Sequence, residues 1–153
     1  MRLSHLAVTA SLLCLLVVSC IDDNENGSLT STHGSRSSMD TGRDCIACHT
    51  SGSEEGEFIV AGTVYQSNGT SVYPNSTVYL YTGADGTGSL AATIEVDGRG
   101  NLYTSDRLSF GSGLYPVVRG SDTTQVAYMG SVITSGSCNA AGCHDAGSRV
   151  SVP

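Results

Sequence analysis

The sequence predicts a mainly β protein, a small antiparallel β-sandwich flanked by two short segments that each carry two cysteines and a histidine. Residues 58–133 are rich in Val, Tyr, Thr, Leu and Ile, and Gly, Asn and Asp interrupt them at short intervals, as is typical of short strands joined by turns. No long helical period competes with this pattern. The polar residues that precede 58 contribute almost nothing to a core, so the sandwich must supply it.

The first 19 residues have the features of a signal peptide. Arg2 gives the start a positive charge, and the apolar run over 6–18 is short for a membrane span. The run closes on Val-Val-Ser-Cys, which resembles the bacterial lipobox, and the resemblance implies that Cys20 is lipidated and begins the mature chain. An ordinary signal peptide cut nearby would instead leave Cys20 free. Ile21 resembles the residue that follows the lipidated cysteine in lipoproteins sorted to the outer membrane.

Residues 20–44 are expected to form a flexible tether between this anchor and the sandwich. They consist mainly of Ser, Thr, Gly, Asn and Asp, which bury too little apolar surface to offset the entropy of ordering them. The chain has 14 acidic residues and 7 basic ones, all of them arginine. This balance disfavours a nucleic-acid partner.

Four cysteines remain once Cys14 leaves with the signal peptide and Cys20 takes the lipid. The first pair lies in residues 45–57, where Cys45, Cys48 and His49 form C-x-x-C-H, the attachment motif of c-type haem. On one helical turn these three side chains share a face, so both thiols and the imidazole can address one porphyrin. A thioredoxin-like redox pair and half of a zinc site are the alternatives. Asp44 precedes the turn as a possible N-cap.

The second pair lies in residues 134–153 and is irregular, because Cys138 and Cys143 are separated by four residues before His144. On a regular helix these thiols would diverge by roughly 140°, so the segment must bulge or loop. Asn139 and Gly142 are the residues best suited to an unusual backbone there. The pattern C-x-x-x-x-C-H resembles the lengthened haem motif of some bacterial multihaem cytochromes. A disulfide loop, or a zinc site shared with the first pair, is the alternative.

Two covalent c-type haems would have His49 and His144 as proximal iron ligands and would need distal ligands as well. The mature chain offers three candidates, His33, Met39 and Met129. Histidine in that position keeps the reduction potential low, and methionine raises it. His33 and Met39 fall in the tether, while Met129 reads equally as a core residue of a strand.

Six strands are expected in the sandwich, with turns at Asn68-Gly69, Gly83 to Gly86 and Asp97-Gly98. Pro116 suggests that its strand lies at a sheet edge. The six ranges are 58–65, 76–82, 89–96, 101–104, 114–119 and 125–133.

The segment AGTVY, the Asn-Gly turn, PNSTVYLY, T-x-x-x-D-G-x-G-N-L-Y and G-L-Y-P-V-V resemble the carboxypeptidase-regulatory or transthyretin-like β-sandwich family. The resemblance covers about half of the chain. It implies a spacer, or a module that binds sugars or protein surfaces, without chemistry of its own.

The expected function is therefore that of a di-haem c-type cytochrome, a lipid-anchored electron carrier at the bacterial cell envelope rather than an enzyme. The acidic chain would attract redox partners that carry a basic patch. An odd strand number would place the two motifs at opposite ends of the sandwich and favour head-to-tail association into a haem chain. A surface binding module of a larger electron-transfer complex, and a lipoprotein stapled by zinc or a disulfide, are the alternative functions.

Overall fold

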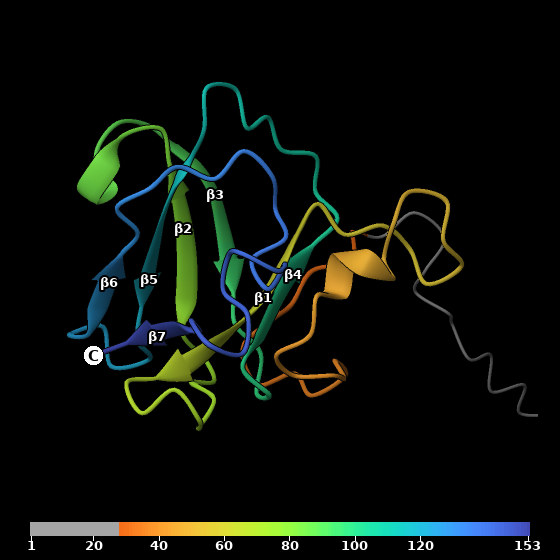
Figure 1. Cartoon of the computed structure of the whole chain (residues 1–153), viewed down its shortest axis with the longest axis horizontal. Helices are drawn as coiled ribbons and strands as arrows, with labels where there is room; N and C mark the ends of the chain where they lie inside the picture. Colours follow the sequence, from red (N-terminus) through yellow and green to blue (C-terminus); the bar gives the residue numbers. More distant parts are fainter. Residues whose placement is uncertain (1–27) are drawn as a thin grey trace, which may run out of the picture.

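The computed structural model describes residues 28–153, which form two packed sheets (Figure 1). The signal peptide expected at 1–19 and the lipidation expected at Cys20 lie outside the described residues. One sheet has the order β4-β1-β7 and the other β3-β2-β5-β6. The strands are β1 (Val60–Gln66), β2 (Thr77–Tyr81), β3 (Leu90–Glu95), β4 (Asn101–Thr104), β5 (Tyr115–Arg119), β6 (Val126–Tyr128) and β7 (Val150–Val152). The prediction of a small, mainly β sandwich is confirmed.

The core lies between the sheets and follows the two-residue period of the strands. In β2, Val78 and Leu80 are buried while the residues between and beside them are half-buried. They meet Val60 and Val64 of β1 in one hydrophobic cluster. Burying a side chain such as Leu80 contributes roughly 1.5–3 kcal/mol, so a handful of such residues supports this small domain.

The strand predictions hold best where alternation is strong. Strand β4 has its predicted bounds, β2, β3 and β5 lie within theirs, and β1 ends one residue beyond its predicted range. The range 125–133 yields only the short β6, after which Ile133 forms an isolated bridge with Leu114. Strand β7 falls in a region for which no strand was expected. It runs parallel to β1, so the three-stranded sheet is mixed rather than purely antiparallel.

The prediction that Pro116 marks an edge strand is wrong. Strand β5 lies between β2 and β6, and Pro116 pairs with Leu80. The carbonyl of Pro116 accepts a hydrogen bond from the N–H of Met129, just beyond the end of β6. Residues of an antiparallel strand direct N–H and C=O to the same neighbour, so the proline nitrogen faces the end of β6 and the ladder with β2 loses no bond.

The described part of the expected tether, residues 28–44, packs against the sandwich. Ser31 is buried, and its hydroxyl donates to the carbonyl of Glu95 at 2.5 Å. Ser38 donates to the carboxylate of the buried Asp97. The segment therefore has only two large apolar side chains, Leu29 and Met39, and is held by hydrogen bonds to backbone and side-chain oxygens. Within residues 28–153, no helix has the length and apolar character needed to cross a membrane.

Candidate functional site

The first motif forms a short helical turn, η1 (Cys45–Ala47). The carbonyl of Cys45 accepts hydrogen bonds from the N–H groups of Cys48 at 3.2 Å and His49 at 2.9 Å. This closes the turn that the spacing predicts. Cys48 is exposed and Cys45 is half-buried, and burial followed by the nearby Asp44 and Asp40 carboxylates raises the pKa of the Cys45 thiol. The expected side-chain cap by Asp44 is not formed.

The imidazole of His49 is oriented by the loop that follows it. Its Nδ1 lies 3.0 Å from the carbonyl oxygen of Gly56. A carbonyl oxygen only accepts, so Nδ1 donates its proton and Nε2 keeps a free lone pair. The ring stacks on Phe58 with centroids 3.8 Å apart, and Phe58 stacks on Tyr103 of β4 at 4.8 Å. The ring of His49 is thus held both by a hydrogen bond and by aromatic stacking.

The second motif is a loop docked on the edge of β1. Gly136 accepts from the N–H of Ala61 at 2.9 Å, and the N–H of Cys138 donates to the carbonyl of Ala61 at 3.0 Å. The chain then leaves the strand and returns as β7, which pairs with the other end of β1. The N–H of His144 donates to the carbonyl of Cys138 at 3.0 Å, closing the loop that the five-residue spacing requires.

Two residues were expected to take an unusual backbone in this loop, and only one does. Gly142 has φ +85°, a conformation that favours glycine. Asn139 instead acts through its side chain. It is buried, and its Oδ1 accepts from the N–H of Thr63 in β1 at 2.9 Å. An unpaired buried N–H costs about 1–3 kcal/mol, so Asn139 ties the motif to the sheet.

Cys138 packs into the sandwich rather than standing free. A Cβ placed on Gly62 would lie 2.7 Å from Cys138 Cβ, so this glycine of β1 provides the space for the cysteine. Burial raises the pKa of the Cys138 thiol to about 12, with smaller contributions from Cys143, Asp44 and Cys45. Cys143, by contrast, is exposed.

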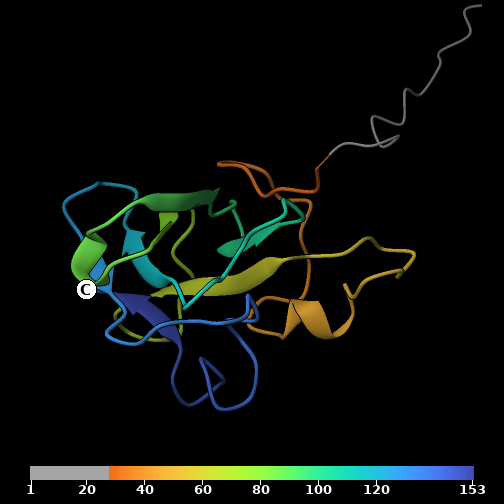
Figure 2. The same cartoon turned by 90° about the horizontal axis from the view of Figure 1, so that it is seen from above.

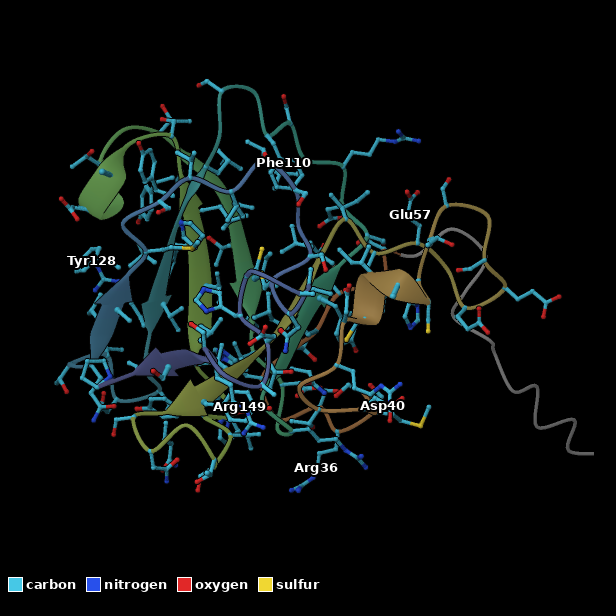
Figure 3. The ribbon with its side chains drawn as sticks, viewed as in Figure 1. Arg36, Asp40, Glu57, Phe110, Tyr128 and Arg149 are labelled. Carbon is cyan, nitrogen blue, oxygen red and sulfur yellow. The ribbon has the colours of Figure 1, made fainter. Side chains whose placement is uncertain are left out.

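His144 is oriented in the same way as His49. Its Nδ1 lies 2.8 Å from the carbonyl oxygen of Ser148, so the proton is on Nδ1 and Nε2 is free to bind a metal. Ser148 is followed by Arg149, whose guanidinium lies 4.5 Å from the ring centre of Tyr65 (Figure 3). The arginine fixes the end of the loop against β1.

A mostly apolar cavity of about 260 Å³ opens beside this second motif. Cys138, Cys143 and His144 line it, and so does the thioether-bearing Met129. The rest of the wall comes from the sandwich core and the strand edges, including Val78, Leu102, Val118, Ala127, Ile133 and Val150. The structure therefore places one candidate distal ligand and the second motif around a single apolar space.

The other two distal candidates are placed differently. His33 Nε2 donates to the carbonyl of Ser76 at 2.9 Å, and its Nδ1 lies 3.9 Å from a carboxylate oxygen of Glu95. The ring is therefore bound to the start of β2 and the end of β3. The side chain of Met39 is 74 % exposed and precedes the first motif by a few residues.

The two motifs lie side by side, and six strands, β1 to β6, separate them in the chain because β7 follows the second motif. Ser137 donates to the carboxylate of Asp44 at 2.5 Å, joining the residues that directly precede Cys138 and Cys45. Figure 2 shows η1 and the loop of the second motif on the same side of β1. An even number of strands between the motifs agrees with this placement, since only an odd number was expected to separate them, and both segments fold back onto β1.

The four cysteines are free thiols in the structure. Among residues 28–153, no three His, Cys, Asp or Glu side chains gather closely enough to hold a single metal ion. The thiols are not arranged as a zinc cluster in this conformation. Sequence reasoning missed Ser137, the two glycines Gly62 and Gly136, and the side-chain bond by which Asn139 holds the motif to Thr63. A glycine within a strand signals close approach of another segment, so Gly62 carried a usable clue.

Comparisons with protein-family models, with curated proteins and with solved structures give no match to this chain.

Proposed function

We propose that this chain is a di-haem c-type cytochrome, a lipid-anchored electron carrier of the bacterial cell envelope whose frame is a sandwich of the carboxypeptidase-regulatory kind. The haems are attached through Cys45 and Cys48 and through Cys138 and Cys143. The parts of this proposal that involve the lipid anchor depend on the sequence motif at Cys20.

The observation that carries the proposal is the matched orientation of His49 and His144. Each donates Nδ1–H to a backbone carbonyl, that of Gly56 or Ser148, so that in the neutral imidazole Nε2 carries the free lone pair. Metal-binding histidines commonly donate their second ring N–H in this manner, which fixes the tautomer and raises the basicity of the ligating nitrogen. A disulfide loop needs no such histidine, and here both motifs have one.

The thiols supply the covalent attachment. Each of the four thiols would hold the group by adding its Sγ–H across one vinyl group of the porphyrin, which would form a C–S bond and place the thiol hydrogen on the neighbouring carbon without net oxidation. In the first motif, the turn that binds the N–H groups of Cys48 and His49 to the carbonyl of Cys45 keeps the three side chains together. In the second motif, the bond from His144 N–H to the carbonyl of Cys138 does the same.

The haem iron, when bound, would accept and release single electrons, and the protein would set its potential through ligands and burial. At the second motif the chain offers the apolar cavity with Met129 in its wall. Its volume of about 260 Å³ is near the low end of cofactor pockets, roughly 300–1,000 Å³. It would cover part of a porphyrin and leave the rest accessible to a partner. A methionine ligand there would raise the potential of that site.

The partners that fit are redox proteins with a basic surface. The full chain has a formal net charge of −7, and such a charge accelerates association with a positive partner at low ionic strength. In Figure 3, Glu57 lies on the loop that follows the first motif, with Glu54 and Glu55 just before it in the sequence. This acidic loop is the part of the surface that we expect such a partner to approach.

The test is the intact mass of the mature protein made in a host with c-type haem maturation, together with a pyridine haemochrome spectrum. We expect two covalent haems in the natural protein and one in each of the paired variants Cys45→Ala/Cys48→Ala and Cys138→Ala/Cys143→Ala. Ser51→Ala, at an exposed position in the loop after the first motif, is a control that should keep both. One haem in the natural protein would favour a disulfide or metal clip at the second motif, and none would overturn the proposal.

A further inference from the structure

Strand β1 holds the two motifs through adjacent contacts. The N–H of Thr63 donates to Asn139 of the second motif at 2.9 Å. The hydroxyl of the same Thr63 accepts from the N–H of Gly42, three residues before Cys45, at 2.9 Å. One buried residue in the middle of a strand therefore contacts the segments that lead into both motifs.

A direct bond completes this arrangement. Ser137 and Asp44, each adjacent to the first cysteine of its motif, are joined by a hydrogen bond from the serine hydroxyl to the carboxylate. Ser137 is itself held in register by its bridge to Ala61. The two attachment points are thus fixed relative to each other by a strand, not by flexible loops.

From this juxtaposition we propose that the two haems form a close pair within one molecule, each serving as the other's electron-transfer partner, and that the bond between Ser137 and Asp44 helps to hold the pair together. This inference rests on the proposed function, because it requires both haems. It differs from head-to-tail association, in which neighbouring haems would belong to different molecules.

A close pair has two measurable consequences. The electronic transitions of neighbouring haems couple, so the visible circular dichroism of the Soret band becomes bisignate. The charge of one haem iron also changes the reduction equilibrium of the other haem. Unit charges roughly 10 Å apart in a medium of dielectric constant about 20 change each other's equilibrium roughly ten-fold, which corresponds to about 59 mV for a one-electron couple.

The experiment compares the natural protein with the two single-haem variants, Cys45→Ala/Cys48→Ala and Cys138→Ala/Cys143→Ala, after their haem content has been fixed by mass. We expect a bisignate Soret signal in the monomeric fraction of the natural protein that the sum of the two variant spectra does not reproduce. We also expect the gap between the two midpoint potentials of the natural protein to exceed the gap between those of the variants by about 59 mV, which is ten-fold in the equilibrium constant of a one-electron couple.

The outcomes separate the two proposals. Fewer than two haems by mass overturns the proposed function and the pair together. Two haems with a spectrum equal to the sum of the variants overturns the pair alone, as does a coupled signal that occurs only in oligomers. Ser137→Ala should keep both haems and weaken the coupled signal, and Ser131→Ala, at an exposed position in the preceding loop, should leave it unchanged. An unchanged signal in Ser137→Ala would overturn the role of that bond.

Discussion

The two motifs end in the same pair of residues but are built in different ways. The first is a short helical turn held by hydrogen bonds within its own residues. It is linked to the rest of the molecule by Asp44, by the bond from Gly42 to Thr63 and by the aromatic contact of His49. The second has no regular local structure and is held by β1, through Gly136, Asn139 and the half-buried Cys138. A regular spacing can be formed by local structure alone, whereas an irregular one needs tertiary contacts to bring its side chains together.

The largest effect that would sharpen this comparison is expected from Gly136→Ala. A Cβ at this position would lie 1.8 Å from the carbonyl oxygen of Ile59, and that backbone cannot move without disturbing β1. We expect a loss of about 3 kcal/mol in the free energy of unfolding, at the upper end of overpacking costs, and a loss of the second haem before the first. Urea unfolding and intact mass measure the two effects. Gly130→Ala, with no atom within 4 Å of its Cβ, should change stability by less than about 0.5 kcal/mol.

The next effect concerns the thiols of the haem-free protein. Cys48 and Cys143 are exposed, whereas the pKa of Cys138 is raised to about 12. We expect iodoacetamide at pH 8 to modify Cys138 at least ten-fold more slowly than the two exposed thiols. A pKa raised from 9.0 to about 12 lowers the thiolate fraction roughly a thousand-fold, and the greater nucleophilicity of a more basic thiolate offsets only part of this. Mass spectrometry of timed samples measures the rates, and equal rates in guanidinium chloride are the control.

The raised pKa of Cys138 also makes the free energy of unfolding depend on pH. The folded protein favours the neutral thiol of Cys138, so the unfolded chain binds fewer protons between pH 9 and about 12. The contribution of this group is complete below pH 9 and is lost as the pH rises toward 12. If all four thiols of the folded protein instead react with iodoacetamide at equal rates, the second motif is not docked on β1.

The smallest effect is expected from Phe58→Leu, which removes the ring stacked on His49. Such contacts contribute about 0.5–1.5 kcal/mol beyond buried area, and the change should alter the ring resonances of His49 but not those of His144. Phe110→Leu is the matched control. Phe110 packs against the core on a distant loop (Figure 3), so a similar loss of stability should leave both histidines unchanged. A shift at His144 in Phe58→Leu would contradict the separate construction of the motifs.

The sandwich was predictable because its strands carry their own signal. Alternating apolar residues such as Val78 and Leu80 and turns such as Asn68-Gly69 are local features. Strand β7 was not predictable, since Val-Ser-Val is too short to show a period and its parallel partner lies far away in the chain. Residues 28–44 were expected to be a tether because hydropathy ignores hydrogen bonds, and the hydroxyls of Ser31 and Ser38 make those bonds.

The motifs themselves were predictable from spacing, but their proximity was not. No local pattern shows that Ser137 meets Asp44, because that contact depends on how both segments return to β1. Met129 was one of three distal candidates in the sequence, and its position in a strand suggested a core residue. Only the fold sets it apart, by placing it in the same cavity wall as His144. The prediction for Pro116 failed for a similar reason. A proline fits inside this sheet because its nitrogen faces the end of β6, and the residues around Pro116 do not show where β6 ends.

The parallel pairing of β7 with β1 also bears on the order of folding. Val64 pairs with Val150, a contact of very high sequence separation, and contacts of this kind form slowly because a long loop must close first. The turn of the first motif closes among neighbouring residues and can form in well under a millisecond. The two motifs should therefore mature at different times, so that a maturation enzyme meets a preformed first site while the second is still an open chain with all of its thiols accessible.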